Sequence, residues 1–300
     1  MLNLSKRIGL IDVDGHNFPN LALMKISAFH KAKGDNVEWC FPMTHYDLVY
    51  QSKVFDDTYS SDIDWTPQAD RIIKGGTGYG LNNTLPYEIE HIYPDYSLYP
   101  ELTKDTAYGF LTRGCPRGCK FCIVGEKEGL RSVKVADLSE FWRGQKHIEL
   151  LDPNLLACKE RMDLLDQLIE SRAIVNFNQG IDIRLTNEEV AERLGRMRIK
   201  RIHFAWDNPK QDLTPYFQRF SESYRRKSSS TKVAYVLVNF DSTMEENLYR
   251  IYTLRDLGYD PYVMIYDKPN APKEIKQLQR WVNNKFIFRS CEKFEDYRKE

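Results

Sequence analysis

The sequence from residue 105 to residue 270 alternates six apolar, strand-like runs with helical patterns. This order favours parallel strands joined by right-handed crossovers, because each helix returns the chain to the same end of the sheet. We therefore predict an α/β fold, a partial barrel of six strand–helix units. A capping box, Ser242 with Glu245, predicts the start of the helix after the fifth strand. The predicted strands are residues 107–112, 147–151, 173–178, 199–206, 232–240 and 261–267.

A shorter α/β pattern occupies residues 1–92. The apolar run KRIGLID is followed by a loop, by a helical pattern that ends at Gly34, and by strand-like runs at 37–41, 47–52 and 70–76. We predict a small doubly wound, Rossmann-like domain whose functional loops follow the carboxyl ends of its strands. Residues 93–104, with two prolines and no helical or strand period, are predicted to be a linker. Residues 271–300 are predicted to form a closing helix and an extension.

Three cysteines, Cys115, Cys119 and Cys122, stand in one loop directly after the first of the six strands. Barrel folds carry their chemistry at the carboxyl ends of their strands. Gly114 and Gly118 allow tight turns, so that the three thiolates can converge on one small inorganic cluster. Iron–sulfur clusters normally take one thiolate per corner, and three thiolates on a four-iron cubane leave one iron open. An open metal position is where a substrate or cofactor binds.

Composition limits the binding partners and the cellular compartment that we expect for this chain. Lys plus Arg and Asp plus Glu both total 43, so the net charge is zero. This balance argues against a chain whose main task is to bind nucleic acid, without excluding it, because phosphate binding rests on a surplus of Lys and Arg. The amino-terminal apolar run is too short for a signal peptide, and no stretch approaches the roughly 18 apolar residues of a membrane span. We expect a cytoplasmic protein with no membrane partner, in which clustered cysteines bind metal and Cys40, Cys158 and Cys291 are plain thiols.

The stretch Cys115-Pro-Arg-Gly-Cys119-Lys-Phe121-Cys122 resembles the C-x-x-x-C-x-x-C motif of the radical S-adenosylmethionine (SAM) superfamily, with its aromatic residue before the last cysteine. The resemblance covers about residues 105–270. It implies a 4Fe-4S cluster on the three cysteines, with SAM chelating the fourth iron. An electron passed through the cluster cleaves SAM to give a 5′-deoxyadenosyl radical, which abstracts hydrogen from a substrate that the sequence does not identify. The family also implies a flavodoxin or ferredoxin as the reductant.

Position at the strand ends further implies contacts with SAM. Asp152 stands where family members carry a Gly-Gly-Glu-like stretch that binds the methionine amino group. Asp182 and Arg184 follow the third strand, and Asp207 follows the fourth, where relatives often carry an acidic residue that reaches SAM. Phe121 joins this set as the aromatic residue of the motif. The structural alternatives are a plain ion pair between Asp182 and Arg184 and a plain turn at Asp207.

The front domain resembles the cobalamin-binding-like domains that precede many such enzymes. Asp14-Gly15-His16 fits the first half of the motif D-x-H-x-x-G, in which the histidine binds cobalt, but Pro19 stands in place of the glycine. Two interpretations stay open: a cobalamin site that serves radical methylation, or a domain that keeps the fold without the cofactor. Ser52 loosely matches the family's S-x-L, and Gly75 and Gly76 match its paired glycines at the nucleotide tail.

Other functions remain open beside the radical SAM enzyme. A zinc site would combine these cysteines with His147 or His203. A protein of a different class would be a non-catalytic zinc or iron–sulfur scaffold that recognises nucleic acid or a protein partner.

Overall fold

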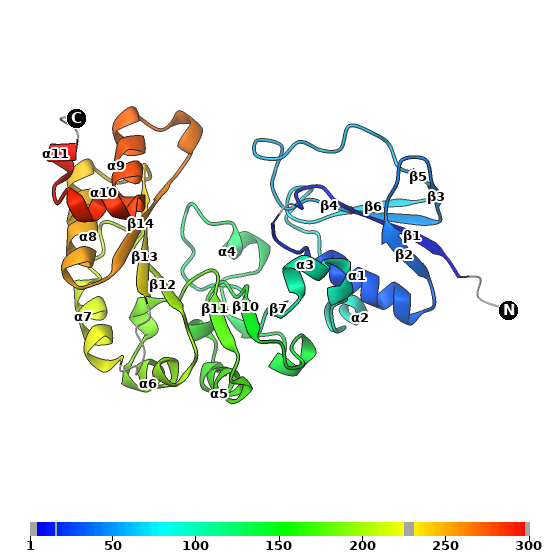
Figure 1. Ribbon diagram of the computed structural model, residues 1–300, viewed down its shortest axis with the longest axis horizontal. Helices are drawn as coiled ribbons and strands as arrows, with labels where there is room; N and C mark the ends of the chain where they lie inside the picture. The colour runs from blue at the N-terminus through cyan, green and yellow to red at the C-terminus, as the bar shows by residue number, and fades with distance from the viewer. Residues whose placement is uncertain (1–4, 16, 225–230, 298–300) are drawn as a thin grey trace. The chain divides into compact units, whose positions relative to one another are not determined.

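A computed structural model describes residues 5–15, 17–224 and 231–297 (Figure 1). The chain forms two compact units. Unit 1 consists of Met1–Gly109 and Ala136–Ile148, and unit 2 of Phe110–Val135 and Glu149–Glu300. Both units combine helices with sheets in which most strand pairs are parallel, so the predicted α/β class is confirmed.

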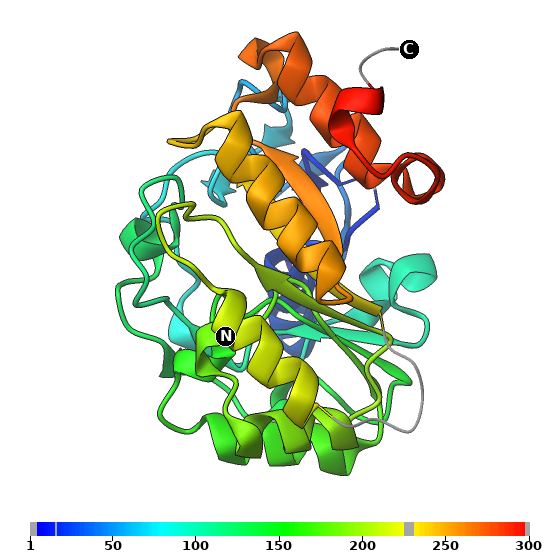
Figure 2. The ribbon, with the colours of Figure 1, turned by 90° about the vertical axis from the view of Figure 1, so that its left-hand side faces the viewer.

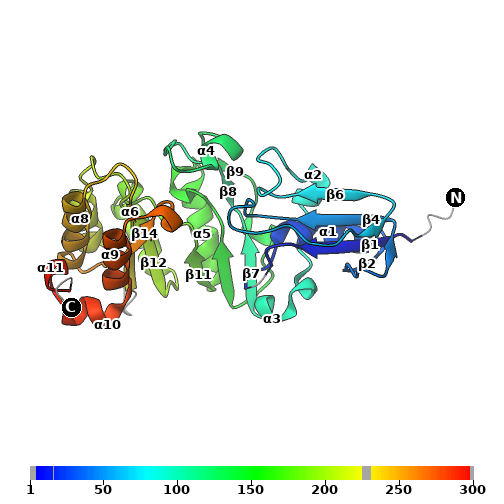
Figure 3. The same cartoon turned by 90° about the horizontal axis from the view of Figure 1, so that it is seen from above.

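The main sheet of unit 1 has the strand order β2-β1-β4-β6, and all its pairs are parallel. Helix α1 lies along one face of this sheet (Figures 1 and 3). Ile8 and Leu10 of the first strand pack under α1, whereas Ile11 packs on the other face with Tyr46 and Val49. A strand buried on both faces needs a continuous apolar run, which explains the sequence IGLI. The strands are β1 (Arg7–Asp12), β2 (Asn36–Trp39), β4 (Leu48–Ser52) and β6 (Ile72–Gly75).

Helix α1 (Leu21–Ala32) begins after an N-cap residue, Asn20, and ends just before Gly34. The Asn20 side chain accepts a hydrogen bond from the backbone N–H of Leu23, at 3.2 Å. Gly34 follows the helix with φ of 83°, a conformation that glycine adopts at no steric cost, so the predicted helix end is confirmed.

Residues 93–104 carry short regular elements and are fixed to the rest of unit 1. The Asp95 carboxylate accepts a hydrogen bond from Ser27 at 2.6 Å, and the Tyr96 hydroxyl donates to the Phe141 carbonyl at 2.6 Å. The remaining elements of unit 1 are short: β3 (His45–Tyr46), β5 (Gln68–Ala69), α2 (Tyr87–Glu90), the 3-10 turns η1 (Tyr96–Leu98) and η2 (Leu138–Glu140), α3 (Pro100–Thr103) and β7 (Thr106–Gly109).

The strands of unit 2 follow the predicted alternation with helices. β12, β13 and β14 form a parallel sheet in that order, and β10 lies beside β11. A parallel bridge joins Ile174 of β11 to Arg198, just before β12. Each of the six predicted strands corresponds to an observed one, the first to β7 of unit 1. The other five are β10 (His147–Leu150), β11 (Ile174–Phe177), β12 (Arg201–Ala205), β13 (Thr231–Val238) and β14 (Asp260–Ile265).

Helices α7 and α8 cover one face of the β12-β13-β14 sheet (Figure 2). Phe204 of β12 points into this layer and packs edge to face with Phe217 and Phe220 of α7. None of the described helices has the length and apolar character that crossing a bilayer requires. The main helices are α5 (Arg161–Ser171), α6 (Glu188–Arg196), α7 (Thr214–Ser223), α8 (Met244–Asp256), α9 (Lys273–Asn283), α10 (Lys285–Ser290) and α11 (Phe294–Tyr297).

The capping box of α8 lies one residue later than predicted. Thr243 Oγ1 accepts a hydrogen bond from the N–H of Glu246 at 3.2 Å, and the Glu246 carboxylate accepts one from the N–H of Thr243 at 2.8 Å. The prediction of Ser242 with Glu245 is therefore wrong. An N-cap residue needs extended backbone angles, and Thr243 has them, with φ −82° and ψ 167°.

Candidate functional site

A short hairpin closes the loop that carries the three cysteines. β8 (Thr112–Arg113) pairs antiparallel with β9 (Val133–Lys134), and the loop between them includes the single-turn helix α4 (Val124–Lys127) (Figure 1). Gly114 has φ of 84°, and a Cβ there would clash with the Arg131 carbonyl. The N–H of Cys115 donates to the Gly129 carbonyl at 3.1 Å. The glycine and these backbone bonds hold the loop closed at its base.

The thiol of Cys119 lies within electrostatic range of the thiols of Cys115 and Cys122. Burial raises the pKa of Cys119, and the charges of Asp207, Cys122 and Cys115 raise it further. Cys119 and Cys122 are exposed, whereas Cys115 is half-buried. Among the described residues, no three His, Cys, Asp or Glu side chains converge closely enough to bind a single metal ion. A cubane requires a wider spread, because each thiolate binds a different iron.

Asp152 ties the end of β10 to the start of the cysteine loop. Its Oδ1 accepts hydrogen bonds from the N–H and the hydroxyl of Thr112, at 2.6 and 2.7 Å, and its Oδ2 accepts one from the N–H of Leu111 at 3.2 Å. Burial raises the pKa of Asp152 to about 6, although these hydrogen bonds, which favour the charged carboxylate, lower it. Both carboxylate oxygens are therefore already engaged by the protein.

Asn154, two residues further on, contacts the first cysteine. Its Nδ2 donates to Cys115 Sγ at 3.6 Å and to Asp182 Oδ2 at 3.4 Å. The residue is 3% exposed, and its Oδ1 is buried without a hydrogen-bond partner among the described residues. A buried acceptor in this state is costly unless something donates to it. Its place after a strand end, close to the predicted Asp152, was the available sequence signal for Asn154.

Asp182 lies between two arginines. Its Oδ2 accepts from Arg117 Nε at 2.5 Å, and its Oδ1 accepts from Arg184 Nε at 2.7 Å. Although burial opposes it, the charges of Arg184 and Arg117 hold the pKa of Asp182 below its ordinary value. The structure thus brings Asp182 and Arg184 together, and Arg117 of the cysteine loop joins them.

Asp207 follows β12 and lies near Cys119. Its Oδ1 accepts the N–H of Leu237 at 3.3 Å. Burial raises the pKa of Asp207 to about 6, while the charges of Arg250 and Arg184 act in the opposite direction. Arg250, which is 1% exposed, donates to the carbonyl of Trp206 at 2.6 Å and to that of Asp207 at 3.1 Å. The bonds from Arg250 hold the backbone turn at Asp207, and the bond from Leu237 holds its side chain.

Phe121 of the cysteine motif packs against the carboxyl ends of two strands. Its ring lies edge to face with Phe240, at 5.4 Å between centroids, and Phe240 lies edge to face with Tyr266 at 4.8 Å. Asn239 and Asp241, on either side of Phe240, have φ of 65° and 48°, which is costly for residues other than glycine. The loop after β13 therefore holds Phe240 in place against the cysteine motif.

No protein-family model matches this sequence, and no curated protein has a significant sequence match to it. The functional argument therefore rests on the residues themselves. In unit 2 these are the cysteine loop, Asn154, the Asp182 cluster and Asp207, all at the carboxyl ends of strands.

Asp14 of unit 1 bridges two loops. Its Oδ2 accepts hydrogen bonds from the N–H groups of Val54 and Phe55, the latter at 3.2 Å. Its Oδ1 is buried and has no hydrogen-bond partner among the described residues. Ser52 Oγ accepts from Asn20 Nδ2 at 2.8 Å. His16, the predicted cobalt ligand, lies outside the described residues.

The paired glycines of unit 1 differ in their surroundings. A Cβ on Gly75 would meet open space, whereas one on Gly76, which has φ of 94°, would clash with the Lys53 carbonyl. A Cβ on Gly78 would clash with the Phe55 carbonyl and the Lys53 side chain. Lys53 is fully buried and forms an ion pair with Asp57. Gly76 and Gly78 therefore allow their backbone to pass close to the Lys53–Phe55 segment.

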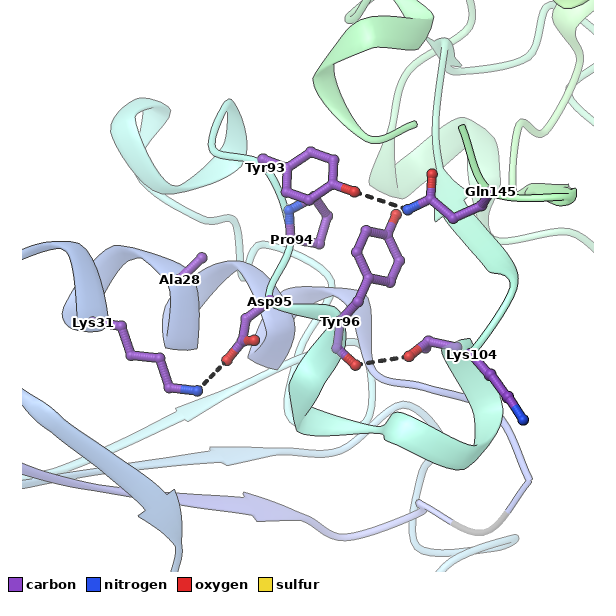
Figure 4. A pocket seen from close by; sticks show the side chains of 9 residues that line it. Ala28, Lys31, Tyr93, Pro94, Asp95, Tyr96, Lys104 and Gln145 are labelled. Carbon is purple, nitrogen blue, oxygen red and sulfur yellow. Dashed lines mark hydrogen bonds and ion pairs between the residues drawn. The ribbon is translucent and has the colours of Figure 1, made fainter. Parts of the chain in front are cut away.

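An open pocket of about 450 Å³ also lies in unit 1 (Figure 4). Its polar groups largely bond one another: Lys31 pairs with Asp95 at 2.6 Å, and Gln145 donates to the Tyr93 hydroxyl at 2.8 Å. None of these residues was predicted from the sequence to belong to a site, and their mutual bonding leaves them no evident chemical task.

Proposed function

We propose that this chain is a radical SAM enzyme that binds a 4Fe-4S cluster on Cys115, Cys119 and Cys122. The main support is a single loop that carries the three thiols, with Cys119 in electrostatic range of the other two. Asp152 holds the base of this loop, and its first cysteine accepts a hydrogen bond from Asn154. Strands β7 and β10–β14 would form the partial barrel, and the order β2-β1-β4-β6 supports a doubly wound, Rossmann-like unit 1.

The donor set fits the cluster and SAM. Three thiolates satisfy three irons, and the fourth is left to the amino and carboxylate groups of SAM. When bound, the cluster and SAM supply a reductive cleavage that yields the 5′-deoxyadenosyl radical. A one-electron donor such as flavodoxin or ferredoxin is required, and the cytoplasm is a compartment where such donors and free thiols coexist.

We assign the SAM amino group to Asn154. Its Oδ1 is a buried acceptor without a partner among the described residues, whereas both oxygens of Asp152 are engaged by Thr112 and Leu111. An ammonium donor would satisfy the unpaired oxygen. Asp152 then has a positioning role, because it fixes the strand end from which Asn154 projects.

The other predicted residues have distinct tasks in this proposal. Arg184 and Arg117, held by Asp182, offer positive charge near the cysteine loop for the carboxylate of SAM. Asp207 lies near Cys119 and accepts from Leu237, which orients it toward the same loop. Phe121 packs on Phe240 and so fixes the cysteine motif against the loop that follows β13.

Unit 1 is proposed to keep its fold without cobalamin. The close approach of Gly76 and Gly78 to the Lys53 and Phe55 carbonyls explains both glycines by loop packing alone, and Pro19 replaces the glycine of the D-x-H-x-x-G motif. Radical methylation through cobalamin is therefore not part of this proposal, and the substrate reaction is hydrogen abstraction by the radical.

Production of 5′-deoxyadenosine tests the proposed function. The full chain is reconstituted anaerobically with iron and sulfide, then given dithionite and SAM, and the product is quantified by chromatography. We expect 5′-deoxyadenosine from the wild type and from Cys291→Ala, and none from Cys119→Ala. A protein that holds zinc, or one that holds iron and sulfide without cleaving SAM, would instead support the non-catalytic scaffold.

A further inference from the structure

The hairpin that carries the cysteine loop, residues 112–134 of unit 2, exposes three aliphatic side chains (Figures 1 and 3). Ile123, Leu130 and Val133 are 49%, 59% and 49% exposed. Single apolar side chains scattered over a surface are ordinary, whereas several within one short hairpin indicate a surface that binds a partner.

Leu130 lies against the turn of the cysteine motif. A Cβ on Gly118 would lie 3.5 Å from Leu130 Cδ2, and a Cβ on Gly125 of α4 would lie 2.9 Å from the same atom. Gly118 directly precedes Cys119 in the sequence. The Leu130 side chain is therefore placed between this turn and α4, and most of the residue still faces solvent.

The backbone beneath these side chains is fixed. Glu128 Oε2 accepts a hydrogen bond from the N–H of Gly114 at 3.1 Å, and its Oε1 accepts one from Arg113 at 2.9 Å. The Cys115 N–H donates to the Gly129 carbonyl at 3.1 Å. A surface whose backbone is already held in place loses little conformational entropy when a partner binds, which favours association.

The same hairpin has a surplus of positive charge, although the whole chain is neutral. It contains six Lys and Arg residues and two Glu residues, of which Glu128 is paired with Arg113. Lys120 and Arg131 are exposed, and neither forms an ion pair with another residue in the described part of the chain. The basic residues are Arg113, Arg117, Lys120, Lys127, Arg131 and Lys134. The exposed aliphatic side chains therefore have a basic surrounding.

A partner protein would cover most of this hairpin at once. A specific interface buries about 800 Å² on each partner and takes roughly 20–30 residues from each side. The hairpin is no larger than that. A partner placed on Leu130 therefore also reaches Ile123, Lys120 and Arg131, and we call these four residues the docking surface. An apolar centre with charged residues around it is the usual composition of such an interface.

We propose that the docking surface binds an acidic protein that carries a one-electron cofactor. Carboxylates of the partner would pair with Lys120 and Arg131, while its apolar side chains would cover Leu130 and Ile123. A nucleic-acid strand fits this surface less well. Unpaired bases stack on aromatic rings, whereas the exposed apolar side chains of this hairpin are aliphatic.

The role of this partner as an electron donor rests on the proposed function, whereas its binding does not. Reductive cleavage of one SAM molecule takes up one electron, so the cofactor of the partner is oxidised by one electron and the cluster is reduced by one. Cys119 and Cys122 are exposed on the hairpin that the partner would cover. The docking surface would thus bring the donor to the loop that holds the cluster.

Titration calorimetry with a flavodoxin of strongly negative net charge tests the docking. The full, anaerobically reconstituted chain is titrated with the oxidised flavodoxin, so that binding is measured without turnover. Raising the salt concentration from about 50 to about 300 mM should weaken binding at least about fivefold. We expect Leu130→Ala, and separately the double variant Lys120→Gln with Arg131→Gln, to weaken it at least about tenfold.

Matched control variants lie outside the hairpin. The double variant Arg219→Gln with Lys276→Gln removes two exposed cations from α7 and α9, and Phe286→Ala removes an exposed apolar side chain from α10. These controls should bind flavodoxin as the wild type does. All variants should retain the iron content of the wild type.

Turnover with two reductants separates docking from chemistry. With reduced flavodoxin, Lys120→Gln with Arg131→Gln should form 5′-deoxyadenosine at least about tenfold more slowly than the wild type when flavodoxin is limiting. With dithionite, a small reductant that needs no docking surface, the two proteins should form it at the same rate. Equal rates with flavodoxin would contradict the inference.

The two proposals can fail independently. The docking inference is overturned if flavodoxin does not bind, if the test variants bind as the controls do, or if an eight-nucleotide oligouridylate binds more tightly than flavodoxin. Cys119→Ala should still bind flavodoxin while losing 5′-deoxyadenosine formation. Wild-type protein that binds flavodoxin at the docking surface but does not cleave SAM with dithionite would overturn the proposed function alone.

Discussion

Asn283 of α9 completes the hydrogen bonding of Val263 on the edge strand β14. Its Oδ1 accepts the Val263 N–H at 2.8 Å, and its Nδ2 donates to the Val263 carbonyl at 3.0 Å. An edge strand otherwise leaves such groups open to pairing with another chain. One side-chain amide thus takes the place of a neighbouring strand.

Replacing this amide should destabilise unit 2. We expect Asn283→Leu to lower the free energy of unfolding by about 1–3 kcal/mol, because the Val263 N–H loses its acceptor. Gln279→Leu should cost less than about 1 kcal/mol, since Gln279 donates only to the Val263 carbonyl, which keeps its bond from Asn283. Urea unfolding of both variants measures the difference. Equal losses would contradict this account.

The two neighbouring glycines of unit 1 give a second test. Gly76→Ala should destabilise the protein by roughly 2–4 kcal/mol, because the residue has φ of 94° and its new Cβ would strike the Lys53 carbonyl. Gly75→Ala, with open space around its Cβ, should change stability by less than about 0.5 kcal/mol. Thermal unfolding of the pair decides this, and similar midpoints would count against the close packing of these loops.

Asp207 should make stability depend on pH. Its pKa of about 6 in the folded protein lies above the ordinary 3.8, so the folded state holds this proton more tightly than the unfolded state does. The stabilisation is complete below about pH 4 and is lost as the pH rises through about 6. Relative to Asp207→Asn, the wild type should therefore lose roughly 1–2 kcal/mol between pH 4 and pH 8, since partial exposure reduces the full effect.

Urea unfolding of wild type and Asp207→Asn at several pH values measures this difference. Comparing the two proteins cancels the contribution of Asp152, whose pKa is also about 6. A difference that stays constant, or that grows in favour of the wild type as the pH rises, would be inconsistent with a raised pKa at Asp207.

Iron retention should distinguish the clustered cysteines from the scattered ones. After anaerobic reconstitution, the wild type should hold about four irons per chain. Cys115→Ser, Cys119→Ser and Cys122→Ser should each lose most of this iron. Cys40→Ser and Cys291→Ser should keep it. Iron and sulfide analysis provides the measurement, and full iron content in any variant of the cluster would argue against the three-thiolate site.

Asn154→Leu should weaken SAM binding about tenfold, because the proposed ammonium acceptor is lost. Its iron content should remain that of the wild type. Equilibrium dialysis of SAM against reconstituted protein measures the affinity. Asn154→Asp, which keeps an acceptor at this position, should recover part of the binding. Unchanged affinity in Asn154→Leu would remove this residue from the proposed SAM site.

The sequence by itself determined the order of strands and helices. Apolar period and turn residues are local properties, so the six later strands and the helix end at Gly34 could be predicted. The spacing of Cys115, Cys119 and Cys122 likewise placed these residues in one loop. The capping box was wrong by one residue, because the backbone angles that decide an N-cap depend on the turn before it.

Only the tertiary structure decided what the polar residues at the strand ends do. Asp152 and Asn154 are two residues apart, yet both oxygens of one are engaged by the protein and an oxygen of the other has no partner in the described part of the chain. The edge-to-face contact of Tyr262 with Tyr235 likewise depends on strand register, which pairs these two residues of β14 and β13. Burial and hydrogen-bond partners come from residues distant in the sequence, and a local pattern carries no information about which of them will meet.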